Sequence, residues 1–342
     1  MPFIRNLWYV AAWSHELEAG QPRGVQVIGE PIVLYRRGDG GAVALEDRCP
    51  HRHAPLSLGR IEGDDLRCMY HGLRFRSDGS CAEVPGVTRV PPRLCARSFP
   101  VVERHGWVWV WSGDPARADP ALVPAAFGLG DPDWVYRSGG IDYEADYELL
   151  NDNLCDLSHL DFVHETSLGR STGAKWSTEQ PRIVAEPNGL RFERWFRDHP
   201  ITPGRSERVD TWSSYRYLLP GIFLLGTQSF PVGTAEASQL GAPDAKPLLS
   251  RIDQQSVTPL GVGRSRYLWG FGLPRAFATP SFVDGVYRVV KTSFDEDRRM
   301  IEAQQAIWKA TSPEQPRGFI PQDQGPALFR RMIAQRLADE AR

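Results

Sequence analysis

Short apolar runs alternate with turn residues through the first third of the chain. The runs are rich in Val, Ile, Trp and Tyr, and Gly, Asp and Pro separate them, as is typical of short β-strands joined by tight turns. Four of them cover residues 25–37, 42–49, 73–81 and 106–113. We interpret the N-terminal run FIRNLWYVAAW as a further strand. This pattern predicts a small all-β domain that ends near residue 112.

A stretch rich in Pro, Ala and Gly, residues 113–134, interrupts that pattern and marks a domain boundary. Beyond it, the segment YELLNDNLCDLSHLDFVHE has the apolar period of a helix. Strand-like runs follow at residues 189–197, 211–227, 248–259 and 265–275, and helices are expected at 292–311 and 325–342. The pattern therefore predicts an α+β fold, with a first domain over residues 1–115 and a second over residues 116–342.

Composition narrows the class of protein. The 342 residues are 41% hydrophobic and 24% charged, with a net charge of -2, so nothing favours nucleic acid or an anionic membrane as a partner. No apolar run approaches the roughly 18 residues of a membrane span, and the N-terminus lacks a cleavage pattern. The cysteines number five, which argues against a disulfide framework. We expect a cytoplasmic protein in which Cys81, Cys95 and Cys155 are buried or half-buried free thiols.

Two Cys-His pairs lie in the stretch CPHRHAPLSLGRIEGDDLRCMYHG: Cys49 with His51, and Cys68 with His71. A zinc finger usually takes two Cys from one arm and two His from the other, whereas here each arm supplies one of each. That is the arrangement of a Rieske [2Fe-2S] cluster, in which two Cys bind one iron and two His the other. The turn residues that suit two loops over a cluster are Pro50, Gly59, Gly63 and Gly72. We therefore favour a Rieske cluster over zinc or a chance spacing, and predict an electron acceptor.

A second set of candidate ligands lies in the helical segment after the boundary. Asn153, Asp156 and His159 follow one another at helical spacing on one face, and His164 comes five residues after His159. A regular helix would turn these two histidines away from each other, so they can meet one metal only if the helix is distorted or ends between them. From the spacing alone, an ordinary pair of core or surface histidines stays open.

A carboxylate ligand is expected from the helix predicted at 292–311. Asp297 falls within an apolar stripe with Phe294 and Ile301, whereas Asp295 groups with charged residues. A buried carboxylate needs a partner, and ferrous iron is one. We therefore choose Asp297, with Asp295 as its rival.

At these residues the chain resembles the Rieske non-heme iron oxygenases. CPHRHAPLSLGR and CMYHGLRF resemble their Rieske domain, and Asp156, His159 and His164 fit a motif D-x2-H-x4-H. Glu296, Asp297 and Glu302 fit a pattern E-D-x4-E. The similarity runs along nearly the whole chain and is greatest to the group that contains vanillate O-demethylase, dicamba monooxygenase and toluenesulfonate methyl-monooxygenase.

The resemblance implies roles for these residues. Cys49, His51, Cys68 and His71 would hold the [2Fe-2S] cluster in a Rieske domain. The metal ligands His159, His164 and Asp297 would hold a mononuclear non-heme Fe(II) in a helix-grip-like antiparallel sheet with long helices. Asp156 would bridge the two centres by accepting a hydrogen bond from His159 and, in a homotrimer, from His71 of the neighbouring subunit. Asn153, on the same face, is a further catalytic candidate.

The resemblance also implies a function. The chain would be the terminal oxygenase component of a multicomponent monooxygenase that uses O₂ to O-demethylate a methoxy-substituted aromatic acid. A separate NADH-dependent flavin/ferredoxin-type reductase would supply the electrons, because this chain has no G-x-G-x-x-G motif that opens a βαβ unit. The alternatives are hydroxylation of an aromatic methyl group or ring, and a non-catalytic Rieske electron-transfer protein. A carrier would need only the first domain, which disfavours it.

Overall fold

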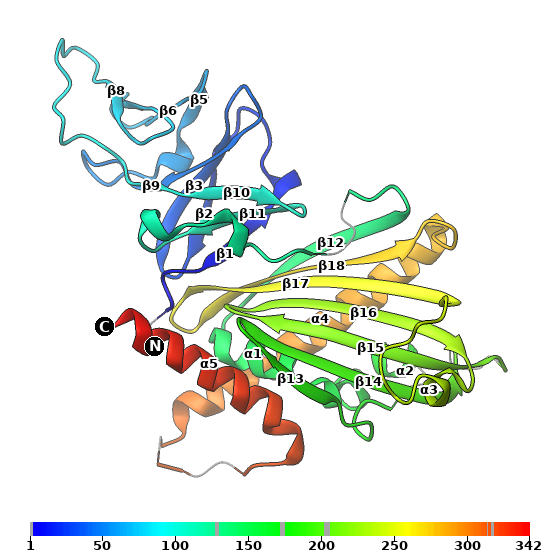
Figure 1. Ribbon diagram of the computed structural model, residues 1–342. Helices are drawn as coiled ribbons and strands as arrows, with labels where there is room; N and C mark the ends of the chain where they lie inside the picture. Colours follow the sequence, from blue (N-terminus) through cyan, green and yellow to red (C-terminus); the bar gives the residue numbers. More distant parts are fainter. Residues whose placement is uncertain (1–2, 127–129, 172–174, 202–205, 313, 316–317) are drawn as a thin grey trace. The chain divides into compact units, whose positions relative to one another are not determined.

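The computed structural model describes residues 3–126, 130–171, 175–201, 206–312, 314–315 and 318–342 (Figure 1). The chain divides into two compact units. The first consists of Met1–Ala125 with Thr258–Val262 and Glu340–Arg342, and the second of Ala126–Val257 with Gly263–Asp339. In the described part of the chain, no helix is both long enough and apolar enough to cross a membrane.

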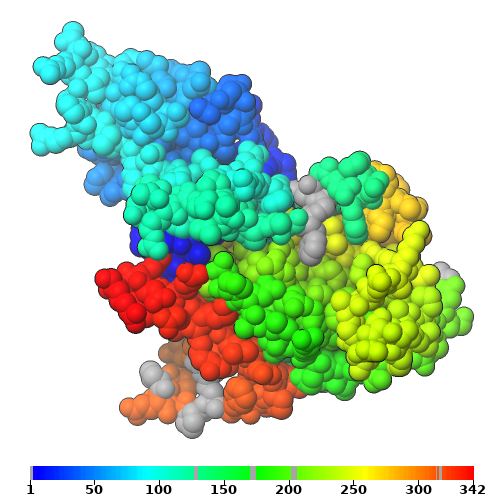
Figure 2. Space-filling view, viewed as in Figure 1, coloured from blue at the N-terminus to red at the C-terminus, as the bar shows by residue number. Residues whose placement is uncertain are grey.

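The first unit is built from three small antiparallel sheets, which confirms the all-β prediction. Their strand orders are β1-β11-β10, β2-β3-β4-β9 and β5-β6-β7-β8. The bounds are β1 Trp8–Trp13, β2 Arg23–Val27, β3 Glu30–Arg36, β4 Ala42–Glu46, β5 Arg60–Glu62, β6 Asp65–Arg67, β7 Arg74–Phe75, β8 Cys81–Glu83, β9 Ser98–Phe99, β10 Val101–Arg104 and β11 Trp107–Trp111. Figures 1 and 2 show the segment that contains β5, β6 and β8, in light blue to cyan, at one end of this unit.

The sheet that contains β3 separates two hydrophobic clusters. Successive strand residues point to opposite faces, so Ile32 and Leu34 pack in one cluster while Val33 and Tyr35 pack in the other. The turn between β2 and β3 has positive φ angles at Ile28 (45°) and Gly29 (83°), as a two-residue hairpin requires. The second cluster also contains the side chains of Cys49 and Cys68. The loops that carry these cysteines are therefore anchored in a packed core.

The second unit contains a seven-stranded antiparallel sheet in the order β12-β18-β17-β16-β15-β14-β13. The strands are β12 Trp134–Tyr143, β13 Arg182–Glu186, β14 Gly189–Pro200, β15 Arg208–Leu218, β16 Ile222–Pro231, β17 Leu249–Gly261 and β18 Arg264–Pro274. The helices are α1 Tyr147–Cys155, α2 Leu168–Ser171, α3 Thr234–Ala237, α4 Pro280–Ala310 and α5 Gln324–Glu340. The α+β prediction is confirmed, although the sequence pattern did not reveal β12 or β13.

Two helix predictions need correction. The long helix α4 begins at Pro280 rather than near residue 292, because Thr279 caps it by accepting a hydrogen bond from Phe282 N (3.4 Å), with Pro280 at the first position. The helix expected over residues 147–165 stops at Cys155, where Asp156 takes an extended conformation. A 3-10 helix, η5 (Leu157–Asp161), follows, and the Asp156 side chain caps it.

Aromatic packing fixes α4 against one face of this sheet (Figure 1). The ring centroid of Phe294 on α4 lies 5.1 Å from that of Trp269 and 5.0 Å from that of Tyr267, both on β18. The following aromatic side chains of this sheet are buried, with at most 6% exposure: Trp212, Tyr215, Tyr217, Phe223, Trp269 and Phe271. Because Phe294 is one helical turn before Asp297, this packing also places Asp297.

Candidate metal centres

The two Cys-His loops of the first unit have the same backbone pattern. In the first loop, Cys49 N donates to Ala54 O and His53 N donates to Cys49 O, each at 2.9 Å. The second loop repeats this with Cys68 N to Leu73 O (2.8 Å) and Gly72 N to Cys68 O (3.0 Å). The residue four positions after each cysteine has positive φ, 57° at His53 and 75° at Gly72. Because the two loops share this backbone form, they hold their Cys and His side chains in matching positions.

The four side chains of these loops come together in two pairs. Cys49 and Cys68 are buried, at 2% and 1% exposure, and burial beside the second thiol raises the pKa of Cys49 to about 11. His51 and His71 are exposed, and their ring centroids are 4.6 Å apart. Two adjacent buried sulfurs and two adjacent imidazoles are the donor set of a Rieske cluster, with the imidazole end at the surface of the unit.

All five cysteines are free thiols. Cys81 and Cys155 are buried as expected. The expectation for Cys95 is wrong, because its side chain is exposed in the irregular segment between β8 and β9.

In the second unit, His159, His164 and Asp297 converge. One ligand atom from each lies within 4.8 Å of the others. Asp297 Oδ1 is 3.6 Å from His159 Nε2 and 3.3 Å from His164 Nε2. Two imidazoles and one carboxylate on one side of a metal, with positions left open, form the ligand set of non-heme Fe(II) oxygenases.

The break in the helix after Cys155 makes this convergence possible. His159 lies in η5, which ends at Asp161, so the chain between His159 and His164 is not a continuous helix. This meets the condition that the spacing of the two histidines imposes. The turn between His164 and Gly169 is tight, because a Cβ on Gly169 would lie 2.4 Å from Leu160 O.

Hydrogen bonds orient both imidazoles with Nε2 toward Asp297. His159 Nδ1 lies 2.6 Å from the main-chain oxygen of Asp156, and His164 Nδ1 lies 3.0 Å from Glu296 Oε2. Carbonyl and carboxylate oxygens only accept, so Nδ1 donates in both contacts and each Nε2, when it carries no proton, can give its lone pair to a metal.

The two histidines differ electrostatically. Burial lowers the pKa of His159. Burial also opposes the charged form of His164, but its hydrogen bonds with Asp297 and Glu296 outweigh burial and raise its pKa.

The structure places Asp297, and not Asp295, beside the histidines. The Asp297 side chain is 7% exposed, whereas the Asp295 side chain is 32% exposed and pairs with Lys291 (3.0 Å) and Arg298 (3.2 Å). The burial of the two carboxylates follows the apolar stripe in the sequence.

Asn153 also lies at this site, with Nδ2 3.2 Å from Asp297 Oδ1 and 3.3 Å from His159 Nε2. Asp156 contacts His159 too, but through its main-chain oxygen, so a hydrogen bond from His159 to the Asp156 carboxylate is not what the structure shows. Its carboxylate instead accepts from Ser158 N (2.8 Å) and Ser158 Oγ (3.0 Å). The cause is the helix end at Cys155, which removes the helical register between Asp156 and His159.

The residue that sequence reasoning did not assign to the site is Glu296. The only sequence feature that pointed to Glu296 was its place in the E-D-x4-E pattern. Burial works against its charge, but hydrogen bonds from Ser167 and His164 outweigh burial and hold its pKa below the usual value.

Comparison with known proteins identifies the family. Residues 7–100 match the Rieske [2Fe-2S] domain, and residues 143–339 match the vanillate O-demethylase oxygenase C-terminal domain. The chain belongs to the Rieske oxygenase family that these domains define. It is 38% identical to the iron-sulfur subunit of the toluene-4-sulfonate monooxygenase system of Comamonas testosteroni over 333 residues, 94% of each chain. It is 34% identical to the vanillate O-demethylase oxygenase subunit of a Pseudomonas species over 352 residues, 99% of this chain and 96% of that one.

Solved structures agree with this assignment. The crystal structure of dicamba monooxygenase bound to dicamba superimposes with a TM-score of 0.87 at 29% identity, covering both chains completely. The chain is therefore the oxygenase component of a Rieske non-heme iron monooxygenase, with a [2Fe-2S] Rieske cluster and a mononuclear iron as cofactors. The residues present fit both groups, since the first unit offers two thiols and two imidazoles and the second two imidazoles and a carboxylate. This finding favours the oxygenase over the electron carrier.

The placement of the two aspartates leads to a prediction. Asp297→Ala should keep the visible Rieske spectrum but lose the mononuclear iron and all product, because two imidazoles alone hold ferrous iron loosely. Asp295→Ala should retain both, since it removes only exposed ion pairs worth about 1 kcal/mol or less. Iron analysis, absorption spectra and turnover of the two variants check this. Mononuclear iron lost from the Asp295 variant and kept in the Asp297 variant would reverse the assignment.

Proposed function

We propose that this oxygenase component O-demethylates a methoxy-substituted aromatic acid. The main support is similarity along nearly the full length to vanillate O-demethylase, together with 35% identity to the oxygenase component of dicamba O-demethylase from Stenotrophomonas maltophilia over 320 residues. In the overall reaction, O₂, two electrons and two protons convert the methoxy compound into a phenol, formaldehyde and water. The methoxy carbon is hydroxylated, and the resulting hemiacetal breaks its C–O bond to release formaldehyde.

A second candidate is hydroxylation of an aromatic methyl group. The observation that favours it is the 38% identity to the toluene-4-sulfonate monooxygenase subunit. Both reactions insert oxygen into a C–H bond of a one-carbon substituent, so the same metal ligands serve either. The contacts of the substrate, rather than the iron site, would decide between them.

We further propose the residue roles. Cys49, His51, Cys68 and His71 ligate the cluster, which passes electrons onward. His159, His164 and Asp297 would hold the iron, which would supply the site for O₂, and Asn153 orients the Asp297 carboxylate by donating its amide to Oδ1.

An electron donor is required as a partner protein. We propose a separate NADH-dependent reductase of the flavin/ferredoxin type, which docks near the cluster. The exposure of His51 supports this, because a donor can approach the imidazole end of the cluster closely. Free cysteines are typical of a reducing compartment, which supports a cytoplasmic location. We propose that the enzyme acts in aromatic catabolism.

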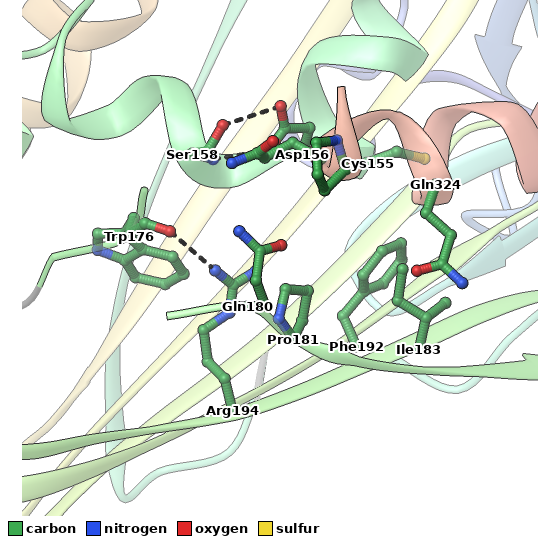
Figure 3. Close-up of a pocket in the computed structure, with 12 residues that line it drawn as sticks. Cys155, Asp156, Ser158, Trp176, Gln180, Pro181, Ile183, Phe192, Arg194 and Gln324 are labelled. Carbon is green, nitrogen blue, oxygen red and sulfur yellow. Dashed lines mark hydrogen bonds between the residues drawn. The ribbon is translucent and has the colours of Figure 1, made fainter. Parts of the chain in front are cut away.

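Asp156 is proposed as the bridge between the two metal centres in a homotrimer. It lines a pocket of about 170 Å³. Figure 3 shows Asp156 and Ser158 on one side of that pocket and Arg194 on the other. Asp156 thus contacts the ligand His159 through its carbonyl and also borders an open pocket. We propose that the exposed His71 of a neighbouring copy donates a hydrogen bond to the Asp156 carboxylate, which shortens the electron path.

The substrate proposal is tested with purified oxygenase, an exogenous reductase of the stated type, NADH and a panel of aromatic acids. Methoxybenzoates, methylbenzoates and toluene-4-sulfonate are compared with the uncharged primary amides of the same acids. We expect formaldehyde from a methoxy acid, one per O₂ consumed. Hydroxymethyl product from a methyl acid, with no formaldehyde from any methoxy acid, would favour the second candidate. No turnover by an enzyme whose cluster is reduced and whose iron site is full would contradict both.

The bridge is tested with Asp156→Asn. The amide oxygen of the Asn side chain can still accept from Ser158 N, so cluster, iron and assembly should stay intact. Electron transfer should slow about 10-fold or more, as expected when a carboxylate that orients a metal ligand is lost. The measurement is single-turnover reoxidation of the reduced cluster with substrate and O₂ by stopped flow. Ser158→Ala, which removes the hydroxyl contact but keeps the carboxylate, is the matched control. Wild-type reoxidation and product yield in the Asn variant would rule out this role.

A further inference from the structure

The two histidines at the iron site are held by different kinds of group. His159 Nδ1 is held at 2.6 Å by a main-chain oxygen, that of Asp156. His164 Nδ1 is held at 3.0 Å by a side-chain carboxylate, that of Glu296. A neutral carbonyl fixes the direction of a ring, whereas a carboxylate also increases the basicity of the imidazole that donates to it. The two imidazoles therefore differ as donors although both present Nε2.

Glu296 is itself held in place by hydroxyl groups. Its carboxylate accepts from Ser167 Oγ (2.5 Å) and Thr166 Oγ1 (3.2 Å) in addition to His164. Ser167 in turn accepts from Ser293 Oγ (2.9 Å), which is fully buried on α4. The side chains of His164 and Glu296 are only 2% and 9% exposed. A carboxylate with three donors and little access to water has little freedom to turn away from the histidine.

Helix α4 thus supplies two carboxylates with different tasks from neighbouring positions. Successive residues of a helix point about 100 degrees apart. Asp297 can therefore face the Nε2 side of His164 while Glu296 reaches the Nδ1 side of the same ring. The other glutamate of the pattern, Glu302, accepts instead from Glu144 N (3.0 Å), at the strand end before α1. Of the two glutamates, Glu296 is the one that contacts a candidate ligand.

We propose that Glu296 is a positioning residue for the mononuclear iron: it fixes the rotation and the Nδ1-H tautomer of His164 and strengthens Nε2 as a metal donor. This inference rests on the proposed ligand role of His164. It assigns Glu296 no contact with substrate or metal. Its effect should therefore appear in metal affinity and in the ligand field, before any turnover.

The test uses full-length protein with its cluster intact and its mononuclear site emptied by a chelator. Co(II) is the probe, titrated by its visible ligand-field bands. Glu296→Gln keeps the size of the side chain but loses the charge and places an amide N–H group among donors, so Co(II) affinity should fall about 10- to 100-fold with a shift in band position. Glu296→Asp, whose carboxylate is one methylene further away, should also bind Co(II) more weakly than wild type.

Two variants control for a structural effect. Glu302→Gln changes the other glutamate of the pattern, and Ser167→Ala removes one tether of Glu296 but leaves the contact with His164. Both should lose less than the ~10-fold lower bound of that range. The thermal midpoint of the iron-free Gln variant should match that of the iron-free wild type.

The possible failures are distinguishable. Wild-type Co(II) affinity and bands in both Glu296 variants would overturn the inference and leave the ligand assignment standing. An equal loss in Ser167→Ala would also overturn it, by showing that Glu296 only tethers the loop to α4. Wild-type affinity in His164→Ala would overturn the ligand assignment and this inference together.

Discussion

The burial of Asp297 between two imidazoles is the constraint on which the catalytic unit depends. A carboxylate that is 5% exposed costs free energy unless a cation or strong donors face it. Here the Asn153 amide donates to Asp297, and the Nε2 atoms of His159 and His164 lie 3.6 and 3.3 Å from it. The position of Asp297 follows from Phe294, whose ring packs against Tyr267 and Trp269 on the sheet. The position of His159 follows from the helix end at Cys155. An iron at this point would be held by the carboxylate and both Nε2 lone pairs at once.

The cluster-binding unit solves a similar problem with loops instead of a helix. Cys49 and Cys68 are buried in the hydrophobic core beside β3, while His51 and His71 remain exposed. The buried sulfurs would shield one iron of a bound cluster from water, and the exposed imidazoles would leave the other iron accessible to a redox partner. Matching hydrogen bonds in the two loops make this arrangement nearly symmetric.

Much of this could be predicted from local patterns, and the remainder depended on contacts between distant segments. Asp297 was separated from Asp295 because a helical stripe distinguishes buried from charged faces. The sequence pattern did not predict the first turns of α4, because Gly285 and several valines have low helix propensity. The helix forms there nevertheless, since Tyr287 packs on Trp269 with ring centroids 5.4 Å apart. Strand β12 was missed because two glycines interrupt its pattern. Glu296 could not be assigned, since its role exists only once the loop with His164 folds beside α4.

The central claim is that one chain combines a two-iron cluster with a mononuclear iron held by two histidines and Asp297. The most direct test is iron quantitation after anaerobic loading with Fe(II), combined with electron paramagnetic resonance of the dithionite-reduced protein. The expected result is three irons per chain, two in a reduced Rieske cluster with its characteristic signal and one that is lost selectively in Asp297→Ala. Two irons per chain in fully loaded wild-type protein, with an intact Rieske signal, would contradict it.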